Sequence, residues 1–429
     1  MDYPEELLHF IWRYRLYDQV NLKTKEGEAL KVIDVGLYNQ NAGPDFEYAL
    51  IELDHVRWKG HVEIHLNEVD WKQHGHHLDP AYNATILHVV WKGGAGDIER
   101  SDGTLMPTLL LSDYVKPQLL QRYNDLSKQH LKIPCEGRME QVLTLLKPGW
   151  LTRLAIERLE AKCKRNSGWL NATKQDWERV FLIGVARAFG TNVNAIAFEE
   201  LLYRIAPNLL YKYLDAPEKI TALLFGVAGF LEEECNDDYF VELKTMYSVL
   251  KKLHGLQNMS PTYWKFMRTR PYNFPTYRLA QLAAQLPVLV YGLERMRTTD
   301  CLQQLLGRMR STELDAYWIT HYRFGKATKK HSTRWSDAYL HLVAINCFIP
   351  VLFSYGKFLG QDHLTERALA WMEQLPTEKN AVIAYYKTQG ISCQSAADSQ
   401  ALLHLKTAYC DRKKCLDCAI GVVILRPSN

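Results

Sequence analysis

Three residues near the N-terminus have the types and spacing that hold a divalent metal ion. Asp45 follows Pro44 directly, and Glu63 and His65 stand two positions apart in the segment VEIH. Alternate side chains of a strand point to the same face, so Glu63 and His65 share one face. Two carboxylates and a backbone carbonyl suit a divalent cation such as Mg²⁺ or Mn²⁺, which activates water and stabilises a phosphoryl transition state. The pattern therefore predicts a site for phosphodiester hydrolysis with Asp45, Glu63 and His65 as catalytic residues.

Histidines are concentrated in the same stretch, since six of the fifteen lie between residues 61 and 88. The auxiliary residues that we predict here are His74, His77, Asp79 and His88. Together with Asp70 they can also form a second cluster, in which imidazoles favour zinc, manganese or iron over magnesium. The sequence leaves two possibilities open. Either these histidines contact the substrate phosphate beside the carboxylate-bound metal, or they hold a transition metal that hydrolyses some other bond.

The periodicity of apolar residues changes once along the chain. A helix is expected over residues 4–18, and short alternating segments follow to about residue 112. The run 46–53 can pair with residues 62–66 through a turn near Asp54 and His55, which would bring Asp45 near Glu63. From about residue 114 to 374 the pattern is helical almost throughout.

This pattern predicts an α+β domain with a mixed sheet, followed by a large all-α domain. The expected boundaries are 1–115 for the sheet domain, 116–390 for the helical domain, and 391–429 for a cysteine-containing C-terminal segment packed on the rest.

The hairpin resembles the PD-(D/E)XK nuclease superfamily, whose fold is that of the restriction endonucleases. Pro44-Asp45 supplies the PD, and Glu63-Ile64-His65 supplies the E-X-K with histidine in the lysine position. The order of elements also agrees, because an acidic helix precedes the hairpin and the strand-like segment 85–91 follows it. The resemblance implies a metal-dependent nuclease in which the first helix adds an acidic residue, Glu6 or Glu5, near the metal.

Histidine in the lysine position is a departure from that superfamily. Lysine there usually orients or helps to deprotonate the attacking water, whereas a histidine can act as a base or become a metal ligand itself. His65 therefore leaves the identity of the metal open.

Taken whole, the chain also resembles a family of bacterial proteins known only as a domain of unknown function. The motifs that carry this resemblance run nearly from end to end: NAGPDF, W-x-G-x-VEIH, DW-x-x-HGHH-x-DPAY, ILHVVW, ALLFGVAG, RPYNFPTYRLAQLA and YCDRKKCLDCAIG. This second resemblance implies no activity, so the chemistry depends on the residues themselves.

Two other classes of protein compete with the nuclease interpretation. One is a non-catalytic nucleic-acid-binding or scaffold protein with a degenerate site, in which Asp45 caps a turn and Glu63 and His65 lie on a solvated sheet face. The other is a zinc or manganese hydrolase that uses His65 and the auxiliary histidines, and it requires their imidazoles to converge on one point.

A second metal-ligating pattern lies near the C-terminus. Cys410, Cys415 and Cys418 form a C-x4-C-x2-C run, and soft thiolates at such spacing suit zinc or an iron–sulfur cluster. Cys393 and Cys135 are the candidates for the fourth ligand, with His404 less favoured. The alternative is a set of reduced thiols in a short buried turn.

Arginines and aromatic residues alternate in the segment RTRPYNFPTYR, a pattern that can grip phosphates and stack on unpaired bases. The residues predicted to bind nucleic acid are Arg268, Arg270 and Arg278. The alternative is a proline-rich entry into a helix whose arginines pair with their neighbours. A net charge of +4 is too small to argue for nucleic acid by itself.

The sequence predicts a cytoplasmic protein with no membrane partner. The N-terminus has no basic region followed by an apolar run, and nine cysteines suggest reduced thiols or metal ligands. The most apolar run, 340–355, is interrupted by His341, Asn346 and Pro350 and is expected to be a buried helix. No pattern in the sequence defines an oligomeric state.

Overall fold

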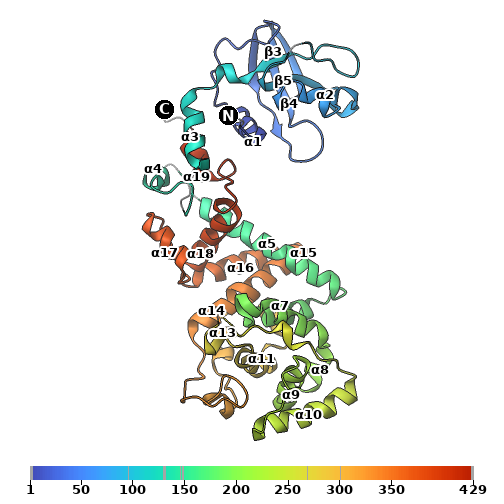
Figure 1. Cartoon of the computed structure of the whole chain (residues 1–429), viewed down its shortest axis with the longest axis vertical. Helices are drawn as coiled ribbons and strands as arrows, with labels where there is room; N and C mark the ends of the chain where they lie inside the picture. The colour runs from blue at the N-terminus through green and yellow to red at the C-terminus, as the bar shows by residue number, and fades with distance from the viewer. Residues whose placement is uncertain are drawn as a thin grey trace. The chain divides into compact units, whose positions relative to one another are not determined.

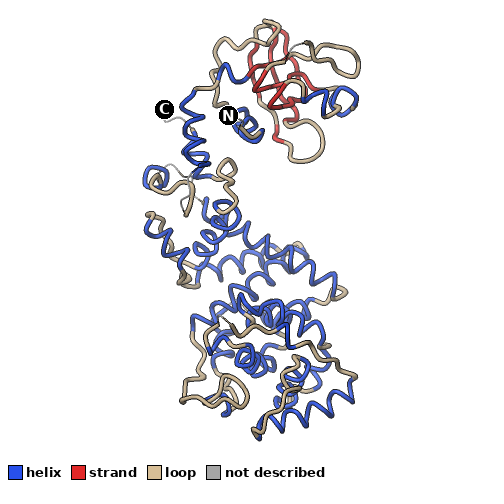
Figure 2. The backbone as a smooth tube through the Cα atoms, in the orientation of Figure 1, coloured by secondary structure: helices blue, strands red, loops and turns tan. Residues whose placement is uncertain are grey.

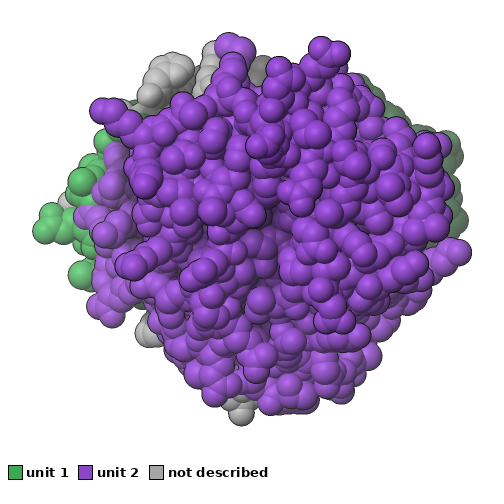
Figure 3. All heavy atoms as spheres, turned by 90° about the horizontal axis from the view of Figure 1, so that it is seen from below, with its two compact units in different colours: residues 1–150, 388–391, 405–429 green, residues 151–387, 392–404 purple. Residues whose placement is uncertain are grey.

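The computed structural model describes residues 3–94, 96–128, 132–144, 146, 149–267, 269–299 and 301–426. The chain forms two compact units, coloured separately in Figure 3. Unit 1 comprises Met1–Trp150, Thr388–Ile391 and Leu405–Asn429, and unit 2 comprises Leu151–Lys387 and Ser392–His404. The C-terminal segment that contains Cys410, Cys415 and Cys418 thus belongs to the same unit as the sheet.

Unit 1 is built on a six-stranded mixed sheet (Figures 1 and 2). The strands are β1 (Leu30–Asp34), β2 (Leu37–Tyr38), β3 (Phe46–Leu53), β4 (Val56–Asn67), β5 (Thr85–Lys92) and β6 (Thr108–Leu110). Their order is β1-β3-β4-β5-β6, with β2 also paired to β3. The pairs among β1 to β4 are antiparallel, whereas β4–β5 and β5–β6 are parallel. The predicted mixed sheet, followed by a helical region, is confirmed.

The helices of unit 1 are α1 (Glu5–Arg13), α2 (Asp70–Gln73), α3 (Pro117–Lys128), α4 (Met139–Leu143) and α19 (Ala419–Leu425), with the short turns η1 (His76–Leu78) and η2 (Pro80–Tyr82). Helix α1 packs against β4 and buries Leu7, Leu8, Ile11 and Trp12, which recur at helical spacing. The connection from β4 to β5 passes through α2, η1 and η2, and it contains three histidines, His74, His76 and His77.

Unit 2 is helical. Its helices are α5 (Trp150–Ala172), α6 (Trp177–Phe189), α7 (Thr191–Arg204), α8 (Pro207–Lys212), α9 (Pro217–Val227), α10 (Asp238–His254), α11 (Pro275–Leu289), α12 (Gly292–Thr298), α13 (Leu302–Arg310), α14 (Asp337–Val343), α15 (Ile349–Leu359), α16 (Asp362–Gln374), α17 (Ala381–Thr388) and α18 (Ala396–His404). The adjacent pairs α6–α7 and α15–α16 pack closely, and α11, buried along most of its length, contacts α6 and α9. Unit 2 therefore has a core of its own, as expected for the helical region.

One continuous helical stretch, residues 337–359, is long and apolar enough to cross a membrane by length and composition. In the structure 67% of its apolar window is buried inside the protein. It runs through α14, a π-helical turn over Ala344–Phe348, and α15. The expected buried helix at 340–355 is confirmed, and its pattern is that of a core helix.

A buried lysine gives unit 2 a pH-dependent stability. Lys162 of α5 donates to Ile345 O, Asn346 Oδ1 and Gln400 Oε1, at 3.0, 3.3 and 3.0 Å. Burial lowers the pKa of Lys162 to about 7 from its ordinary 10.5. Between these values the unfolded chain binds more protons than the folded chain, so the contribution of Lys162 to stability rises with pH.

We therefore expect wild type to gain stability relative to Lys162→Met as the pH rises from 7 to 9, by up to about 1 kcal/mol per pH unit. Urea unfolding of both proteins at several pH values measures this difference, and other titrating groups cancel in the comparison. A constant difference across that range would contradict the assigned cause.

Candidate metal centre

The strand pair β3–β4 brings the two predicted carboxylates together. Asp45 immediately precedes β3, and Phe46 pairs with Val62. The backbone N–H of Asp45 donates to Glu63 Oε2 at 3.1 Å, and the N–H of Ile64 donates to Asp45 Oδ2 at 3.0 Å. These two reciprocal bonds hold both side chains at the same place beside the sheet.

Glu63 and His65 lie on one face of β4, and this face is buried. Glu63 is 5% exposed and His65 is 1% exposed. The alternative in which they lie on a solvated sheet face is therefore wrong. A buried carboxylate needs a partner, because its desolvation is costly. Its partners are the N–H of Asp45 and the imidazoles of His65 and His76.

Two histidines lie beside Glu63, and a third lies beside one of these two. The Nε2 atom of His65 lies 3.4 Å from Glu63 Oε1 and 3.3 Å from His74 Nδ1. His76 Nε2 lies 3.3 Å from the same Glu63 oxygen. Among the residues that the structure describes, His65, His74 and His76 form a group whose ligand atoms all lie within 4.8 Å of one another. The sequence had predicted His74 but not His76 as part of the site.

The separations of these atoms match the first coordination sphere of a metal ion. Metal–nitrogen and metal–oxygen bonds of 2.0–2.2 Å at tetrahedral angles place neighbouring ligand atoms about 3.4 Å apart. The contacts from Glu63 to His65 and His76, and from His65 to His74, are 3.3 to 3.4 Å long. Three imidazoles and one carboxylate are a donor set that suits zinc or manganese. These side chains therefore fit a bound divalent cation.

His88 contacts His65 through the ring nitrogen that does not face Glu63. It is fully buried on β5, and its Nε2 atom lies 2.9 Å from His65 Nδ1. If His65 binds a metal through Nε2, its Nδ1 carries the proton and donates to His88. Such a second bond fixes the orientation of a metal-binding histidine. His88 thus acts through His65, while Trp71 of α2 packs against the ring of His88.

The electrostatics of the site favour neutral imidazoles at His65, His76 and His88. Burial, followed by the charges of His76 and His74, lowers the pKa of His65 to about 4. Burial also lowers the pKa values of His76 and His88. Burial, followed by the charge of Asp45, raises the pKa of Glu63 to about 9. Neutral imidazoles are the form that binds metals, and a cation would offset the cost of ionising Glu63.

Helix α1 contributes Glu5 and His9 to the site, whereas Glu6 points elsewhere. His9 Nε2 lies 3.2 Å from Asp45 Oδ2 and 4.0 Å from Glu5 Oε1. Burial favours neutral His9, but the hydrogen bond to Asp45 and the nearby carboxylates outweigh it and raise the pKa of His9. Burial is also the main cause that raises the pKa of Glu5. Of the two acidic residues considered from the sequence, Glu5 is the one near Asp45.

The remaining predicted auxiliary residues do not belong to the group of converging ligand atoms. Asp79 is exposed and caps η2 by accepting from Ala81 N at 2.9 Å. Asp70 accepts from the backbone of Asn67 at 2.9 Å and so begins α2. His77 follows His76 but does not belong to the converging group of described residues. The expected convergence therefore holds for His65 and His74, with His76 in place of His77.

The predicted nucleic-acid contact at Arg278 is wrong. Arg278 is 7% exposed, donates to Asn273 Oδ1 and Gln281 Oε1, and lies 3.8 Å from the centre of the Tyr339 ring. These contacts occupy the guanidinium inside unit 2, so it is not available to bind a phosphate. Arg270 is exposed and donates to the hydroxyl of Tyr272 at 3.0 Å. Arg268 lies outside the described residues.

Four cysteines gather in unit 1. Cys135, Cys410, Cys415 and Cys418 line one small cavity, although Cys135 is far from the others in sequence. Burial raises the pKa of Cys135, and the nearby Cys410, Cys418 and Cys415 raise it further. Cys393 lies in unit 2, within 3.1 Å of the Thr377 hydroxyl. Of the two candidates for a fourth cysteine, the structure brings Cys135 to the C-terminal three.

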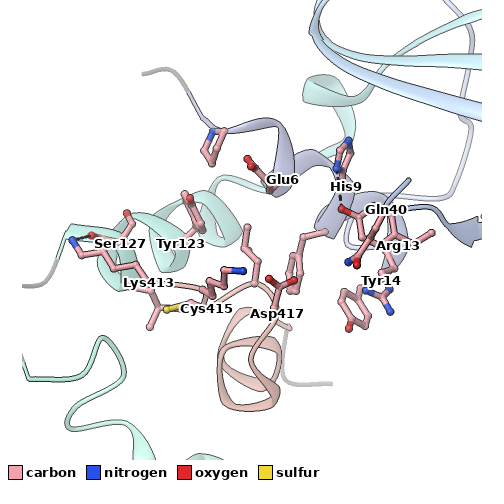
Figure 4. Close-up of a pocket in the computed structure, with 16 residues that line it drawn as sticks. Glu6, His9, Arg13, Tyr14, Gln40, Tyr123, Ser127, Lys413, Cys415 and Asp417 are labelled. Carbon is pink, nitrogen blue, oxygen red and sulfur yellow. Dashed lines mark hydrogen bonds between the residues drawn. The ribbon is translucent and has the colours of Figure 1, made fainter. Parts of the chain in front are cut away.

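A cavity of about 420 Å³ opens beside α1 (Figure 4). Glu6, His9 and Arg13 of α1 line it together with Tyr123 of α3, and Lys413, Cys415 and Asp417 approach from the C-terminal segment. The Tyr38 hydroxyl, also in the lining, lies 3.4 Å from His9 Nδ1. His9 therefore connects this cavity with Asp45 of the candidate metal centre.

The fold and the site together define a protein with a sheet-based candidate metal centre and a helical region. The chain belongs to the family described as "Protein of unknown function (DUF2851)", whose match covers residues 5–381. Neither the curated proteins nor the solved structures include a match to the chain. The family brings no activity with it, so the chemistry must be argued from the residues.

Proposed function

We propose that this protein is a cytoplasmic metal-dependent nuclease that hydrolyses phosphodiester bonds. The observation that carries the proposal is the convergence of Glu63, His65 and His76, with His74, beside the carboxylate of Asp45. Glu63 and His65 are buried, and buried ionisable groups are costly unless they have partners. Such constellations often mark functional sites.

The donor atoms favour manganese or zinc over magnesium in this site. Glu63, His65, His74 and His76 would hold the ion, because imidazole nitrogen suits these metals better than it suits magnesium. A bound divalent cation lowers the pKa of water and stabilises the negative charge that develops on a phosphate under attack. This assignment keeps Glu63 as a ligand, as expected from the sequence, and makes His65 a ligand in place of a lysine-like base.

Asp45 is the candidate proton acceptor for the attacking water. Its Oδ2 atom is held by Ile64 N–H and lies 3.2 Å from His9 Nε2, which fixes the carboxylate beside Glu63. The raised pKa of His9 favours an imidazolium that stabilises the Asp45 carboxylate. Hydrolysis then transfers a proton from water to Asp45, forms a bond from the water oxygen to phosphorus, and breaks the bond to the leaving oxygen. The leaving oxygen keeps the bonding electron pair and takes a proton from solvent.

The cavity beside α1 supports a nucleic acid as the substrate. It joins the exposed cations Arg13, Lys413 and Lys414 with the rings of Tyr38 and Tyr123. Cations that attract phosphates and aromatic rings that stack on bases are the common features of single-strand binding sites. His9 links this cavity to Asp45, so a strand held here would lie close to the candidate metal centre.

The test is a cleavage assay with the full-length protein. Labelled single- and double-stranded DNA and RNA are incubated with Mn²⁺, Zn²⁺ or Mg²⁺ after removal of bound metal. We expect cleavage that depends on the added ion and is best supported by Mn²⁺ or Zn²⁺. Failure of the folded protein to cleave any of these polymers with any of these ions would overturn the proposal.

A separate prediction concerns substrate binding in the cavity beside α1. Replacing Arg13 with alanine should raise KM for a single-stranded substrate about three- to tenfold and leave kcat nearly unchanged, because a phosphate contact is lost far from the reacting bond. The effect should shrink at high salt. Lys31→Ala, which removes an exposed lysine of β1 outside the cavity lining, is the matched control. Equal KM values for the two variants would argue against binding of the substrate strand in this cavity.

A second candidate function rests on the same histidines. His65, His74 and His76 also suit a zinc hydrolase that acts on a bond other than a phosphodiester. Such an enzyme would bind zinc and lose it in His74→Ala, yet fail to cleave any nucleic acid. Metal analysis of both proteins alongside the cleavage assay therefore separates the two candidates.

A further inference from the structure

Four cysteines from two distant parts of the sequence share one cavity of unit 1. Cys135 lies between α3 and α4, whereas Cys410, Cys415 and Cys418 precede α19. The cavity lining also includes Pro134 and other residues of the same two segments. All nine cysteines of the chain are described, and none forms a disulfide. Cys135 and Cys418 are buried, and Cys410 and Cys415 are half-buried. Four thiols around one space are poorly explained by packing, since thiols are weak hydrogen-bonding groups.

The backbone of the C-terminal segment is folded tightly around these cysteines. Lys413 N donates to Cys410 O at 3.1 Å, and Cys418 N donates to Cys415 O at 3.3 Å. Lys413 has a φ of +52°, a conformation that side-chain-bearing residues seldom adopt. At Gly421 a Cβ atom would meet the carbonyl oxygen of Cys415, so the first turn of α19 presses directly on the loop. The segment presents three sulfur atoms from consecutive turns, although it has little apolar core of its own.

The spread of the sulfur atoms distinguishes between kinds of metal site. A single zinc ion bound by four thiolates, with bonds near 2.3 Å, holds sulfur atoms about 3.8 Å apart. Within the part of the chain that the structure describes, the ligand atoms of His65, His74 and His76 are the one group that lies within 4.8 Å of one another. No three cysteine sulfur atoms of the described residues are that close. In an iron–sulfur cluster the cysteine ligands are shared among the irons, so their sulfur atoms are separated by the cluster itself. The four cysteines therefore fit a cluster better than a single ion.

We propose that Cys135, Cys410, Cys415 and Cys418 are the ligands of an iron–sulfur cluster. On assembly of a four-iron cluster from two ferrous ions, two ferric ions and four sulfides, each thiol loses its proton to solvent and its sulfur binds one iron. The cluster would tie the segment around Cys135 to the chain end within unit 1. It is independent of the hydrolytic centre, which uses nitrogen and oxygen ligands on the sheet.

The test is the iron and sulfide content of the full-length protein purified without oxygen. We expect iron and acid-labile sulfide in equal amounts, about two or four of each per chain, with a brown colour and broad absorbance near 400 nm. Zinc without sulfide would overturn the proposal. So would a failure of the protein to retain iron and sulfide after incubation with ferrous iron, ferric iron and sulfide.

Variants identify the ligands. Cys135→Ser and Cys418→Ser should each lose most of the iron and the absorbance, whereas Cys393→Ser should keep both, because Cys393 is a buried cysteine of unit 2. Circular dichroism shows whether each variant remains folded. Retention of a full cluster by Cys135→Ser, or its loss in Cys393→Ser, would overturn the assignment of the fourth ligand. Neither result affects the hydrolytic centre, which is tested by cleavage.

Discussion

Replacing Glu63 with glutamine should reduce metal-dependent cleavage at least about 1000-fold, equivalent to about 4 kcal/mol of transition-state stabilisation. Glutamine keeps the shape of the side chain but removes the negative charge that would bind the ion. Glu63 Oε1 is the atom that both His65 and His76 approach, so its loss affects the whole centre. Cleavage rates under saturating Mn²⁺ and single-turnover conditions measure the effect.

The matched control is Glu52→Gln on the neighbouring strand β3. Glu52 forms a surface ion pair with Arg57 at 3.4 Å and lies outside the histidine cluster. Its loss should change cleavage little, because surface ion pairs contribute at most about 1 kcal/mol. Metal analysis of Glu63→Gln should show less bound metal. A Glu63→Gln protein that binds metal and cleaves as wild type would refute the assigned centre.

The hairpin that positions this carboxylate could be predicted from the sequence because its determinants are local. Alternation with period two places Glu63 and His65 on one face, and the turn residues Asp54 and His55 mark the end of each strand. In the structure both turn residues have positive φ values, 43° and 73°, as a two-residue hairpin loop requires. β3 ends at Leu53 and β4 begins at Val56. Local sequence was therefore sufficient to place the two carboxylates together.

The histidines of the centre could not be chosen in the same way. His74, His76 and His77 follow one another closely, and no periodicity shows which of them faces the sheet. Gly75 between them has a φ of +77°, which redirects the chain and turns His76 toward Glu63. His9 was missed because its position depends on how α1 docks on β4, a contact between distant segments.

Burial explains why two other expectations differed from the structure. Arginine is rarely buried, so Arg278 was assigned to the surface, yet Asn273, Gln281 and Tyr339 together satisfy its guanidinium inside unit 2. Cys393 was the nearest cysteine in sequence to the C-terminal run. The chain places it in unit 2 instead, and Cys135 joins the run through tertiary structure alone.

An ion pair between the exposed Lys25 and the buried Glu68 supports the end of β4 just before the histidine-bearing connection. Glu68 is 2% exposed, and both of its oxygens accept from Lys25 Nζ, at 2.7 and 2.9 Å. The N–H of Gly94, just beyond β5, also donates to Glu68. Lys25 in turn donates to the carbonyls of Gly94 and Gly96, at 3.0 Å each. One lysine thus ties the ends of β4 and β5 together, and α2 with His74 begins two residues after Glu68.

Replacing Lys25 with methionine should destabilise unit 1 by about 2 kcal/mol, because the buried Glu68 loses two charge-assisted hydrogen bonds, although solvent at the exposed Lys25 weakens the pair. Hydrogen exchange of the β4 and β5 amides, together with urea unfolding, measures this loss. We also expect weaker Mn²⁺ binding, since His74 is carried by the loosened segment. Lys23→Met, which removes an exposed lysine two residues earlier, should have little effect on either measurement.

A double variant separates the effect of the buried Glu68 charge from the effect of the hydrogen bonds that Lys25 donates to Gly94 and Gly96. Lys25→Met combined with Glu68→Gln leaves no buried charge, and it should recover a large part of the stability lost in Lys25→Met alone. If the double variant is no more stable than the single one, the lysine acts mainly through its bonds to Gly94 and Gly96. A Lys25→Met protein as stable as Lys23→Met would contradict both explanations, and the end of β4 would then be held by its strand pairing rather than by this ion pair.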